Sequence, residues 1–263
     1  MPDVRRLETH DASLAYTLSG DAGSSAAPVV LIHGWGCQRS DWTAVASELS
    51  ARRRVVALDL PGFGQSSARR TRYTVRAFAE DVSAVIDAEG LGGAAVAGHS
   101  MGGAVALETA LVRPDVSSVI GVDSFHYLQV YPAQDERAVE DFISVFRTDP
   151  DHSIAALVSA SSVPGTDRAL IEEMTLGQIT AARSPDSLNA LEETLRWDMD
   201  AALAAARVPV VALVSGALLA AEATARYGDR IEIRPISQGS HYFLREEPQP
   251  TAAAIEEVIA RPQ

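Results

Sequence analysis

The chain has 263 residues and 47% hydrophobic content, enough to bury the core of one α/β domain with an insertion. Its net charge of -13 and pI of about 4.8 disfavour nucleic acid and anionic membrane surfaces as partners. The single cysteine, Cys37, excludes an intrachain disulfide. No signal-peptide pattern and no apolar run of about 18 residues occurs, so we expect a cytoplasmic protein.

The first part of the chain predicts two short strands and then strands that alternate with helices. Apolar runs that end abruptly, such as 28–32 and 54–58, are typical of strands buried on both faces. Apolar residues at helical spacing mark the segments between and after them. The expected strands are 4–8, 12–18, 28–32 and 54–58, and the expected helices are 40–49 and 73–89.

A Gly-x-Ser-x-Gly turn follows at 98–102, between an expected strand over 93–97 and a helix that ends near 113. A strand–turn–helix context is the setting in which this pattern presents a reactive serine. Gly98 and Gly102 leave room where a Cβ would crowd the neighbouring strand or helix. The pattern therefore predicts that Ser100 lies at the apex of a strained turn, with its hydroxyl exposed.

The rest of the chain predicts an insertion and then a return to strand and helix. Residues 124–206 read as helical segments separated by breaks rich in Pro, Asp and Ser, which suggests a cap over the core. We therefore divide the chain into a core, 1–123 and 207–263, and a helical cap, 124–206. Further expected strands are 116–122, 208–214 and 230–234, and further expected helices are 222–227 and 251–260. Strands that alternate with helices predict a mostly parallel sheet covered on both faces, the α/β class.

Four polar residues follow expected strands and should meet at one edge of this sheet: His33, Ser100, Asp123 and His241. A serine hydroxyl needs a base within hydrogen-bond reach, and His241 is placed to be that base. His99 is next to Ser100 in sequence, but neighbours around a tight turn point apart. The backbone amides of Trp35 and Met101 would hold a developing oxyanion.

Four motifs in this order resemble those of the α/β-hydrolase superfamily. They are His33-Gly34-Trp35-Gly36, Asp59-Leu60-Pro61-Gly62-Phe63-Gly64-Gln65-Ser66, Gly98-His99-Ser100-Met101-Gly102-Gly103 and Gly239-Ser240-His241. The resemblance covers nearly the whole chain, and it is weakest over 124–206. It implies the α/β-hydrolase fold with a helical cap and an esterase-like enzyme with a serine nucleophile. It does not identify the substrate.

The acid of the expected triad departs from the usual pattern of the superfamily. Most members carry a carboxylate in the turn after the strand that corresponds to 208–214, but this chain has Ser215 to Ala221 there, with no carboxylate. Some members carry the acid one strand earlier, where this chain has Asp123. We expect Asp123 to hold His241, with Glu222 as the second choice and a dyad without an acid as the third.

Three functions remain open at this point. The first is a serine hydrolase that cleaves a small or medium ester, thioester or lactone through an acyl-enzyme on Ser100. The second is another reaction on the same site, either hydrolysis of a carbon–carbon bond or a cofactor-free lyase or oxygenase reaction. The third is a non-catalytic ligand-binding member, suggested by the missing carboxylate after residue 214.

The remaining expectations concern ligands. A small-molecule substrate would contact His33, Gly34, His99, Phe125 and His126, and cap aromatics such as Tyr127, Phe142, Phe146 and Trp197 could supply an acyl pocket. The histidines show no metal-ligand spacing, and Gly62-Phe63-Gly64 lacks the third glycine of a dinucleotide loop. We therefore expect no metal and no cofactor, and a monomer or homodimer.

Overall fold

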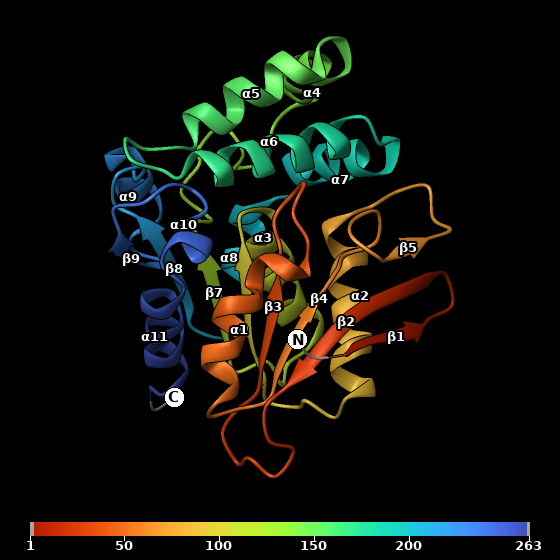
Figure 1. The fold of residues 1–263 in the computed structure, drawn as a ribbon, viewed down its shortest axis with the longest axis vertical. Helices are drawn as coiled ribbons and strands as arrows, with labels where there is room; N and C mark the ends of the chain where they lie inside the picture. The colour runs from red at the N-terminus through yellow and green to blue at the C-terminus, as the bar shows by residue number, and fades with distance from the viewer. Residues whose placement is uncertain (1–2, 262–263) are drawn as a thin grey trace.

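Residues 3–261 are described by a computed structural model, and within them the chain forms one nine-stranded sheet (Figure 1). The strand order is β1-β2-β4-β3-β6-β7-β8-β9, and β5 pairs with β2. From β4 across to β9 the strands run parallel, whereas β2 is antiparallel to β1, β4 and β5. The strands are β1 Val4–Glu8, β2 Ala12–Ser19, β3 Val29–Ile32, β4 Val55–Leu58, β5 Ser67–Ala68, β6 Ala95–His99, β7 Ser118–Val122, β8 Val210–Ser215 and β9 Glu232–Ser237.

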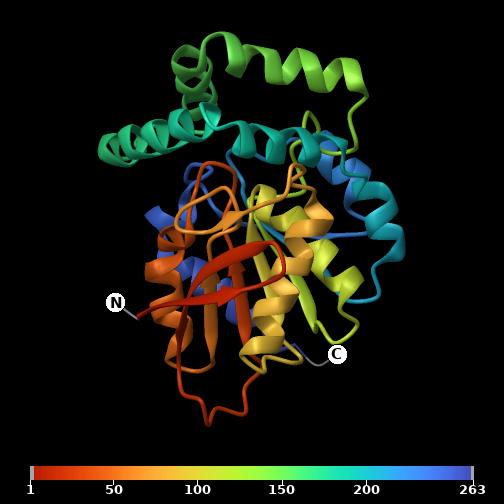
Figure 2. The ribbon, with the colours of Figure 1, turned by 90° about the vertical axis from the view of Figure 1, so that its right-hand side faces the viewer.

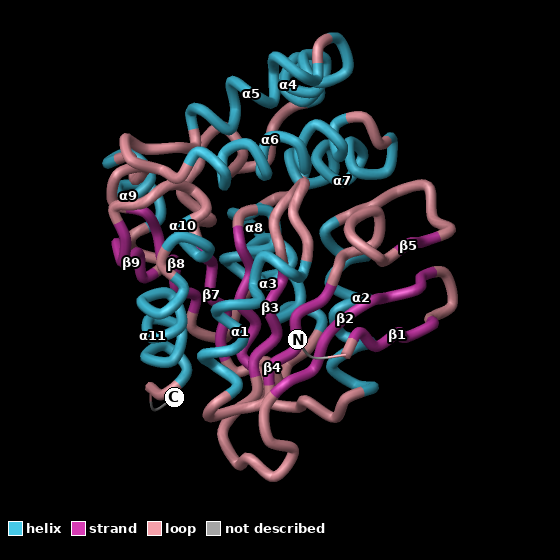
Figure 3. Tube along the Cα trace, viewed as in Figure 1, coloured by secondary structure: helices cyan, strands magenta, loops and turns pink. Residues whose placement is uncertain are grey.

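Helices cover both faces of this sheet and its upper edge (Figures 2 and 3). Those of the core are the short 3-10 helix η1 Arg39–Trp42, α1 Thr43–Ser50, α2 Val75–Ala88, α3 Met101–Val112, α9 Ala221–Tyr227, α10 Phe243–Glu246 and α11 Pro248–Ile259. Those of the predicted cap segment are α4 Glu136–Thr148, α5 Pro150–Ala160, α6 Arg168–Ala182, α7 Pro185–Arg196 and α8 Met199–Ala205. None of the helices in residues 3–261 is long and apolar enough to cross a membrane.

The apolar strand runs explain why the sheet is covered on both sides. Alternate residues of β3 enter different clusters: Val30 and Ile32 pack with residues of α2 and α3, while Val29 and Leu31 pack with residues of α1 and α11. Side chains of a strand alternate between faces, so a continuous apolar run requires a partner layer on each side. The predicted α/β class, a mostly parallel sheet covered on both faces, is thus confirmed.

The helices α4 to α7 lie above the carboxyl ends of the parallel strands, where a cap would cover the site (Figures 1 and 2). Helix α8 packs against α3 of the core, and α7 contacts both α2 and α3. The two short elements β5 and α10 were not expected from the sequence. Each is too short to show a periodic pattern of its own.

Candidate active site

The turn at Ser100 has the strained geometry expected of a nucleophile. Ser100 follows β6 directly, caps α3, and has φ 51° and ψ -121°. Few residues other than glycine adopt a positive φ without support from their surroundings. That support is present: the Ser100 amide donates to Val122 O at 3.0 Å, and its carbonyl accepts from Gly103 N at 2.9 Å and from Ser124 Oγ at 2.8 Å.

The two glycines of the turn are required by close packing rather than by their own dihedral angles. A Cβ on Gly98 would lie 1.9 Å from the carbonyl oxygen of Gly102. A Cβ on Gly102 would lie 2.5 Å from the carbonyl oxygen of Ile32, on the neighbouring strand. The sequence-based explanation of the Gly-x-Ser-x-Gly pattern is therefore confirmed by the backbone geometry.

His241 and Asp123 meet beside this turn although 118 positions separate them in sequence. His241 Nδ1 donates to Asp123 Oδ2 over 2.6 Å. This contact places the proton on Nδ1 and leaves Nε2 as the basic nitrogen of the neutral ring. His241 and Ser100 both line one cavity of about 110 Å³ under the cap.

Asp123 is fully buried, and its backbone has a positive φ of 46°. Its Oδ1 accepts from the amide of Ser215 at 2.8 Å and lies 3.2 Å from His126 Nε2. Burial alone would raise the pKa of Asp123, but the hydrogen bonds and charge of His126 and His241 hold that pKa well below its ordinary value. The Asp123 carboxylate is thus ionised at neutral pH.

The structure brings Asp123, and not Glu222, against His241. Glu222 is exposed near the start of α9. The turn after β8, where the superfamily usually carries its acid, has no carboxylate. Ser215, the last residue of β8, instead donates its backbone amide to Asp123. The end of β8 therefore supports the acid that follows the adjacent strand β7.

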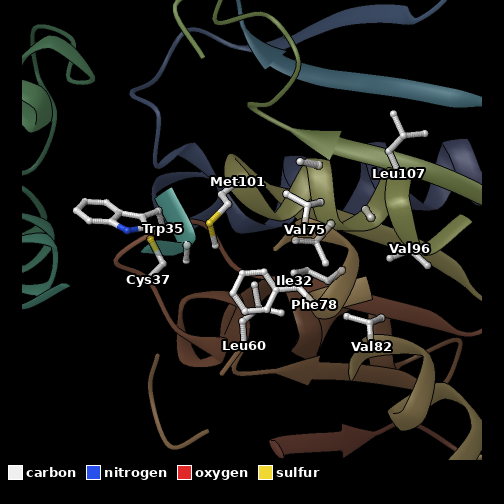
Figure 4. Packing of buried hydrophobic residues seen from close by; sticks show 14 of the residues in the cluster. Ile32, Trp35, Cys37, Leu60, Val75, Phe78, Val82, Val96, Met101 and Leu107 are labelled. Carbon is white, nitrogen blue, oxygen red and sulfur yellow. The ribbon is translucent and has the colours of Figure 1, made fainter. Parts of the chain in front are cut away.

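Two backbone amides, those of Trp35 and Met101, were expected to hold an oxyanion beside Ser100. Met101 is the first residue of α3, so its N–H belongs to the positive end of the helix. Within residues 3–261, neither the amide of Met101 nor that of Trp35 has a hydrogen-bond acceptor. Both side chains line the cavity that contains Ser100. Figure 4 shows Met101 in the cluster of apolar side chains and Trp35 at the end of that cluster nearest the cap.

The Trp35 side chain also joins the core to the cap. Its Nε1 donates to the carbonyl oxygen of Ser187 on α7 at 2.7 Å, and its ring packs against Phe146 of α4. The sequence suggested a role only for the backbone amide of Trp35. The hydrogen bond fixes the loop that carries the Trp35 amide to a cap helix.

His33 is fully buried and is not among the residues that line the cavity at Ser100, so its expected contact with substrate stays a prediction. Both ring nitrogens are used by the backbone: Nδ1 donates to Gly34 O at 2.7 Å, and Nε2 accepts from Leu60 N at 2.9 Å. Burial lowers the pKa of His33, so the ring stays neutral and keeps one nitrogen as a donor and the other as an acceptor. His33 thus holds the Trp35 loop against the loop that begins at Asp59. Gly34 lies under the turn, where a Cβ would be 2.9 Å from His99 Nδ1.

Phe125 and His126 were also expected to contact substrate; both are buried, and neither is among the residues that line the cavity at Ser100, so this contact stays a prediction. Phe125 has a φ of 70°, which turns its ring into the core beneath Gly121. His126 is buried, and its Nε2 forms a hydrogen bond with Asp123 Oδ1. Its Nδ1 has no hydrogen-bond partner among the described residues. Sequence showed that the chain leaves β7 here, but it did not show the left-handed turns at Asp123 and Phe125.

His99 lies at the edge of the cavity but is bound to the backbone of His241. Its Nε2 donates to the His241 carbonyl at 2.9 Å. Burial, with the charge of His241 as a smaller cause, lowers the pKa of His99 to about 3. The ring is therefore neutral and acts as a fixed donor. Its expected contact with substrate stays a prediction.

Two cavity residues were not identified as site residues from the sequence. Tyr127 was expected only as a possible pocket aromatic, yet its hydroxyl donates to Asp123 Oδ2 at 2.5 Å and lies 3.0 Å from His241 Nδ1. Gln178, on α6, lines the cavity and donates to the hydroxyl of Tyr242 at 2.7 Å. No local sequence motif surrounds either residue, so their position at the cavity becomes visible only in the three-dimensional structure. Of the other expected cap aromatics, Phe142 lines the cavity, whereas Trp197 packs on Tyr131.

Comparison with known proteins places the chain in a family. Residues 27–162 match the alpha/beta hydrolase fold family. A pimeloyl-[acyl-carrier protein] methyl ester esterase of Aeromonas hydrophila is 30% identical over 172 residues, 64% of this chain and 66% of that protein. A dihydrolipoyllysine-residue acetyltransferase component of the acetoin cleaving system of Pseudomonas putida is 41% identical over 99 residues, 38% of this chain and 26% of that protein. The chain thus spans about a quarter of the length of that second relative.

A solved structure extends the likeness over nearly the whole chain. A thermophilic esterase from Thermogutta terrifontis superposes with a TM-score of 0.81 at 23% identity, covering 98% of each chain. This agreement concerns the fold, and the match of residues 27–162 adds the sequence evidence. The expected resemblance is confirmed: the chain belongs to the alpha/beta hydrolase fold family.

Proposed function

We propose that this protein is a serine hydrolase that cleaves a small or medium ester, thioester or lactone through an acyl-enzyme on Ser100. The observation that carries the proposal is the hydrogen bond of 2.6 Å between His241 and Asp123, beside the strained Ser100 turn. A base oriented by a buried carboxylate is what a serine hydroxyl needs to become a nucleophile. The unpaired amides of Trp35 and Met101 support the same reaction.

In the first half of the reaction, the Ser100 hydroxyl attacks the carbonyl carbon of the substrate. His241 Nε2 takes the hydroxyl proton as the Oγ–carbon bond forms, and the carbonyl oxygen becomes an oxyanion between the amides of Trp35 and Met101. The protonated ring is stabilised by Asp123, which stays ionised. The bond to the leaving alcohol or thiol then breaks, and that group takes the proton from His241. The acyl group remains on Ser100.

In the second half, water replaces the leaving group. His241 Nε2 removes a proton from the water as its oxygen attacks the acyl carbon, and the oxyanion forms again on the same amides. When the tetrahedral intermediate collapses, the bond to Ser100 Oγ breaks and His241 returns a proton to that oxygen. The carboxylic acid leaves, and the site regains its starting state.

The size of the cavity favours a small acyl group, and the relatives favour an ester. The cavity at Ser100 measures about 110 Å³, and its walls include the apolar side chains of Phe142 and Leu157. The relative from Aeromonas hydrophila is named as a methyl ester esterase and the structural neighbour as an esterase. The third possibility, a non-catalytic binding protein, was suggested by the missing carboxylate after β8. Asp123 supplies a carboxylate to His241 from the adjacent strand, so that reason no longer applies.

The test is intact-mass labelling with a fluorophosphonate, followed by hydrolysis of p-nitrophenyl acetate. We expect one adduct on the wild-type protein, none on Ser100→Ala, and Ser100-dependent release of p-nitrophenol. The Ser100→Ala variant should unfold at the same temperature as wild type or higher, because the bonds that hold the Ser100 turn come from its backbone and not from its hydroxyl. Retained turnover in a folded Ser100→Ala variant would contradict the proposal. An unlabelled wild-type protein that binds esters without turnover would favour the binding function.

A further inference from the structure

The cap places a buried polar side chain at the cavity, and one of its polar atoms has no partner among the described residues. Gln178 of α6 is 5% exposed and lines the cavity that contains Ser100 and His241. Its Nε2 donates to the Tyr242 hydroxyl, but its Oε1 has no hydrogen-bond partner among the described residues. Other polar side chains that the cap adds are satisfied locally: Ser161 Oγ donates to Leu157 O and Thr194 Oγ to Ala190 O.

Gln178 is held at the wall of the cavity by the contact between α6 and the Trp35 loop. A Cβ on Gly36 would lie 2.7 Å from Gln178 Cγ, and one on Gly177 would lie 3.2 Å from the Gly36 carbonyl oxygen. Glycine at both positions lets the helix and the loop touch. On its other side Gln178 contacts Tyr242, the residue after His241. The amide thus lies between the residue after Trp35 and the residue after the expected base.

We infer that Gln178 Oε1 is a specificity-determining acceptor, which binds an N–H or O–H group carried by the substrate close to its scissile carbonyl. The inference rests on the proposed serine hydrolase and narrows its substrates to donor-bearing esters, thioesters or lactones, such as hydroxyacyl or amidoacyl derivatives. A buried acceptor without a partner costs its full desolvation, whereas a substrate that supplies the donor removes that cost. A substrate without the donor leaves it in place, so the site should discriminate between the two.

The test uses two pairs of p-nitrophenyl esters whose members differ by one group. In the first pair, 3-hydroxybutanoate is compared with 3-methylbutanoate, which replaces the hydroxyl by a methyl group. In the second pair, N-acetylglycinate is compared with 4-oxopentanoate, which replaces N–H by CH2. We expect wild type to favour the donor member of at least one pair by about threefold to tenfold in kcat/KM, the range of one net hydrogen bond.

Two variants of Gln178 separate the acceptor from the bulk of the side chain. Gln178→Met keeps the length and removes both polar groups, and its ratio between the two members should fall to about one. Gln178→Glu keeps acceptor oxygens only, so the preference for the donor member should persist. Tyr242→Phe is the matched control: it removes the hydroxyl that Gln178 contacts but leaves Oε1, and it should keep the preference.

The outcomes distinguish this inference from the proposed function. Equal kcat/KM values within both pairs for wild type, with hydrolysis that depends on Ser100, would overturn the role of Gln178 alone. An unchanged preference in Gln178→Met would also overturn it. Hydrolysis that does not depend on Ser100 would overturn the proposed function itself. Thermal unfolding and fluorophosphonate labelling of each variant show whether a lost preference reflects the acceptor or a damaged fold.

Discussion

Asp123 is the residue on which most of the polar contacts of the site converge. Its two oxygens lie within hydrogen-bond distance of the His241 ring, the Tyr127 hydroxyl, the His126 ring and the Ser215 amide. Burial would by itself raise its pKa, but these partners lower it, so the carboxylate remains charged. A charge in the interior is tolerated only when donors satisfy its oxygens, and here they also fix the histidine ring.

The first prediction concerns the substitution Asp123→Asn. The asparagine amide would no longer accept the Nδ1 proton in the same way, which favours the wrong tautomer of His241. We expect kcat for p-nitrophenyl acetate to fall by roughly 10³- to 10⁴-fold, as for the loss of a triad acid. Glu222→Gln is the control and should keep the wild-type rate. If Asp123→Asn is folded by circular dichroism and still hydrolyses the ester at full rate, the acid lies elsewhere.

At this scale the sequence identified the residues that follow strands, but not the directions in which their side chains point. Ser100, Asp123 and His241 could be placed together because parallel strands end at one edge of the sheet. His33 and Phe125 also follow strands at this edge. However, the His33 ring bonds to backbone atoms, and the Phe125 ring packs into the core against Gly121. Side-chain direction depends on local dihedral angles, and at residues 123 and 125 these are left-handed.

At the scale of elements, α7 joins the cap to the core at both of its ends. Near its start, the carbonyl of Ser187 accepts from Trp35 Nε1 at 2.7 Å. Just beyond its end, Trp197 Nε1 donates to Glu108 Oε2 of α3 at 3.1 Å. Each indole donates one hydrogen bond between this part of the chain and the core, but only Trp35 belongs to the loop whose amide is proposed to bind the oxyanion. They therefore offer a matched pair for testing whether the cap positions that loop.

The second prediction compares Trp35→Phe with Trp197→Phe. Each variant loses one hydrogen bond. The bond to the Ser187 carbonyl is worth about 0.5–1.5 kcal/mol of the free energy of unfolding, and the bond to the Glu108 carboxylate about 1.5–3 kcal/mol. We expect Trp35→Phe to slow fluorophosphonate labelling and lower kcat several-fold, because the Trp35 amide is no longer held in place. Trp197→Phe should lower stability at least as much without slowing the labelling. Equal labelling rates in the two variants would show that the cap does not position the loop.

The long strands and helices were predictable because their apolar residues follow a clear period. The arrangement of the cap helices relative to the core was not predictable. The strands β3, β4 and β6 are continuous buried runs, and the helix α2 has a clear apolar face. In the cap, the sequence indicated helices but not their neighbours, so the contact of α6 with the Trp35 loop was missed. That contact depends on Gly36 and Gly177, and single glycines carry no information about which element they touch.

At the scale of the whole molecule, buried histidines make stability depend on pH. His99 has a pKa lowered to about 3, against an ordinary value of 6.5, because it is buried and lies beside His241. Below pH 6.5 the unfolded chain binds a proton there that the folded chain does not bind. The stability is therefore complete above about pH 6.5 and decreases as the pH falls toward 3.

The third prediction is that His99→Gln reduces this pH dependence. Glutamine can still donate to the His241 carbonyl, but it does not titrate. Between pH 7 and pH 5 wild type should lose about 2 kcal/mol more of its free energy of unfolding than the variant does. Urea denaturation at both pH values measures the difference, and the other titrating groups cancel between the two proteins. The same loss in both proteins would mean that His99 is not held neutral.

The negative charge of the chain is concentrated over the site. Residues 124–206 contain 14 acidic residues and 5 arginines, and most of this segment lies above the carboxyl ends of the strands (Figure 1). A field of one sign over a cavity raises the local concentration of oppositely charged molecules and lowers that of like-charged ones. The cap should therefore repel substrates that carry phosphate groups, and salt should weaken this repulsion.

The fourth prediction tests this repulsion with two acetyl thioesters. Acetyl-coenzyme A carries phosphates, whereas S-acetyl-N-acetylcysteamine has the same reacting end without them. At low ionic strength we expect kcat/KM for the coenzyme A ester to be lower by about tenfold or more, since the charges are screened only beyond about 30 Å at 0.01 M salt. Raising the salt to about 0.3 M should narrow the gap, while the rate for the uncharged thioester stays constant. Equal rates that do not respond to salt would show that the acidic cap does not select substrates by charge, and that selection lies in the cavity alone.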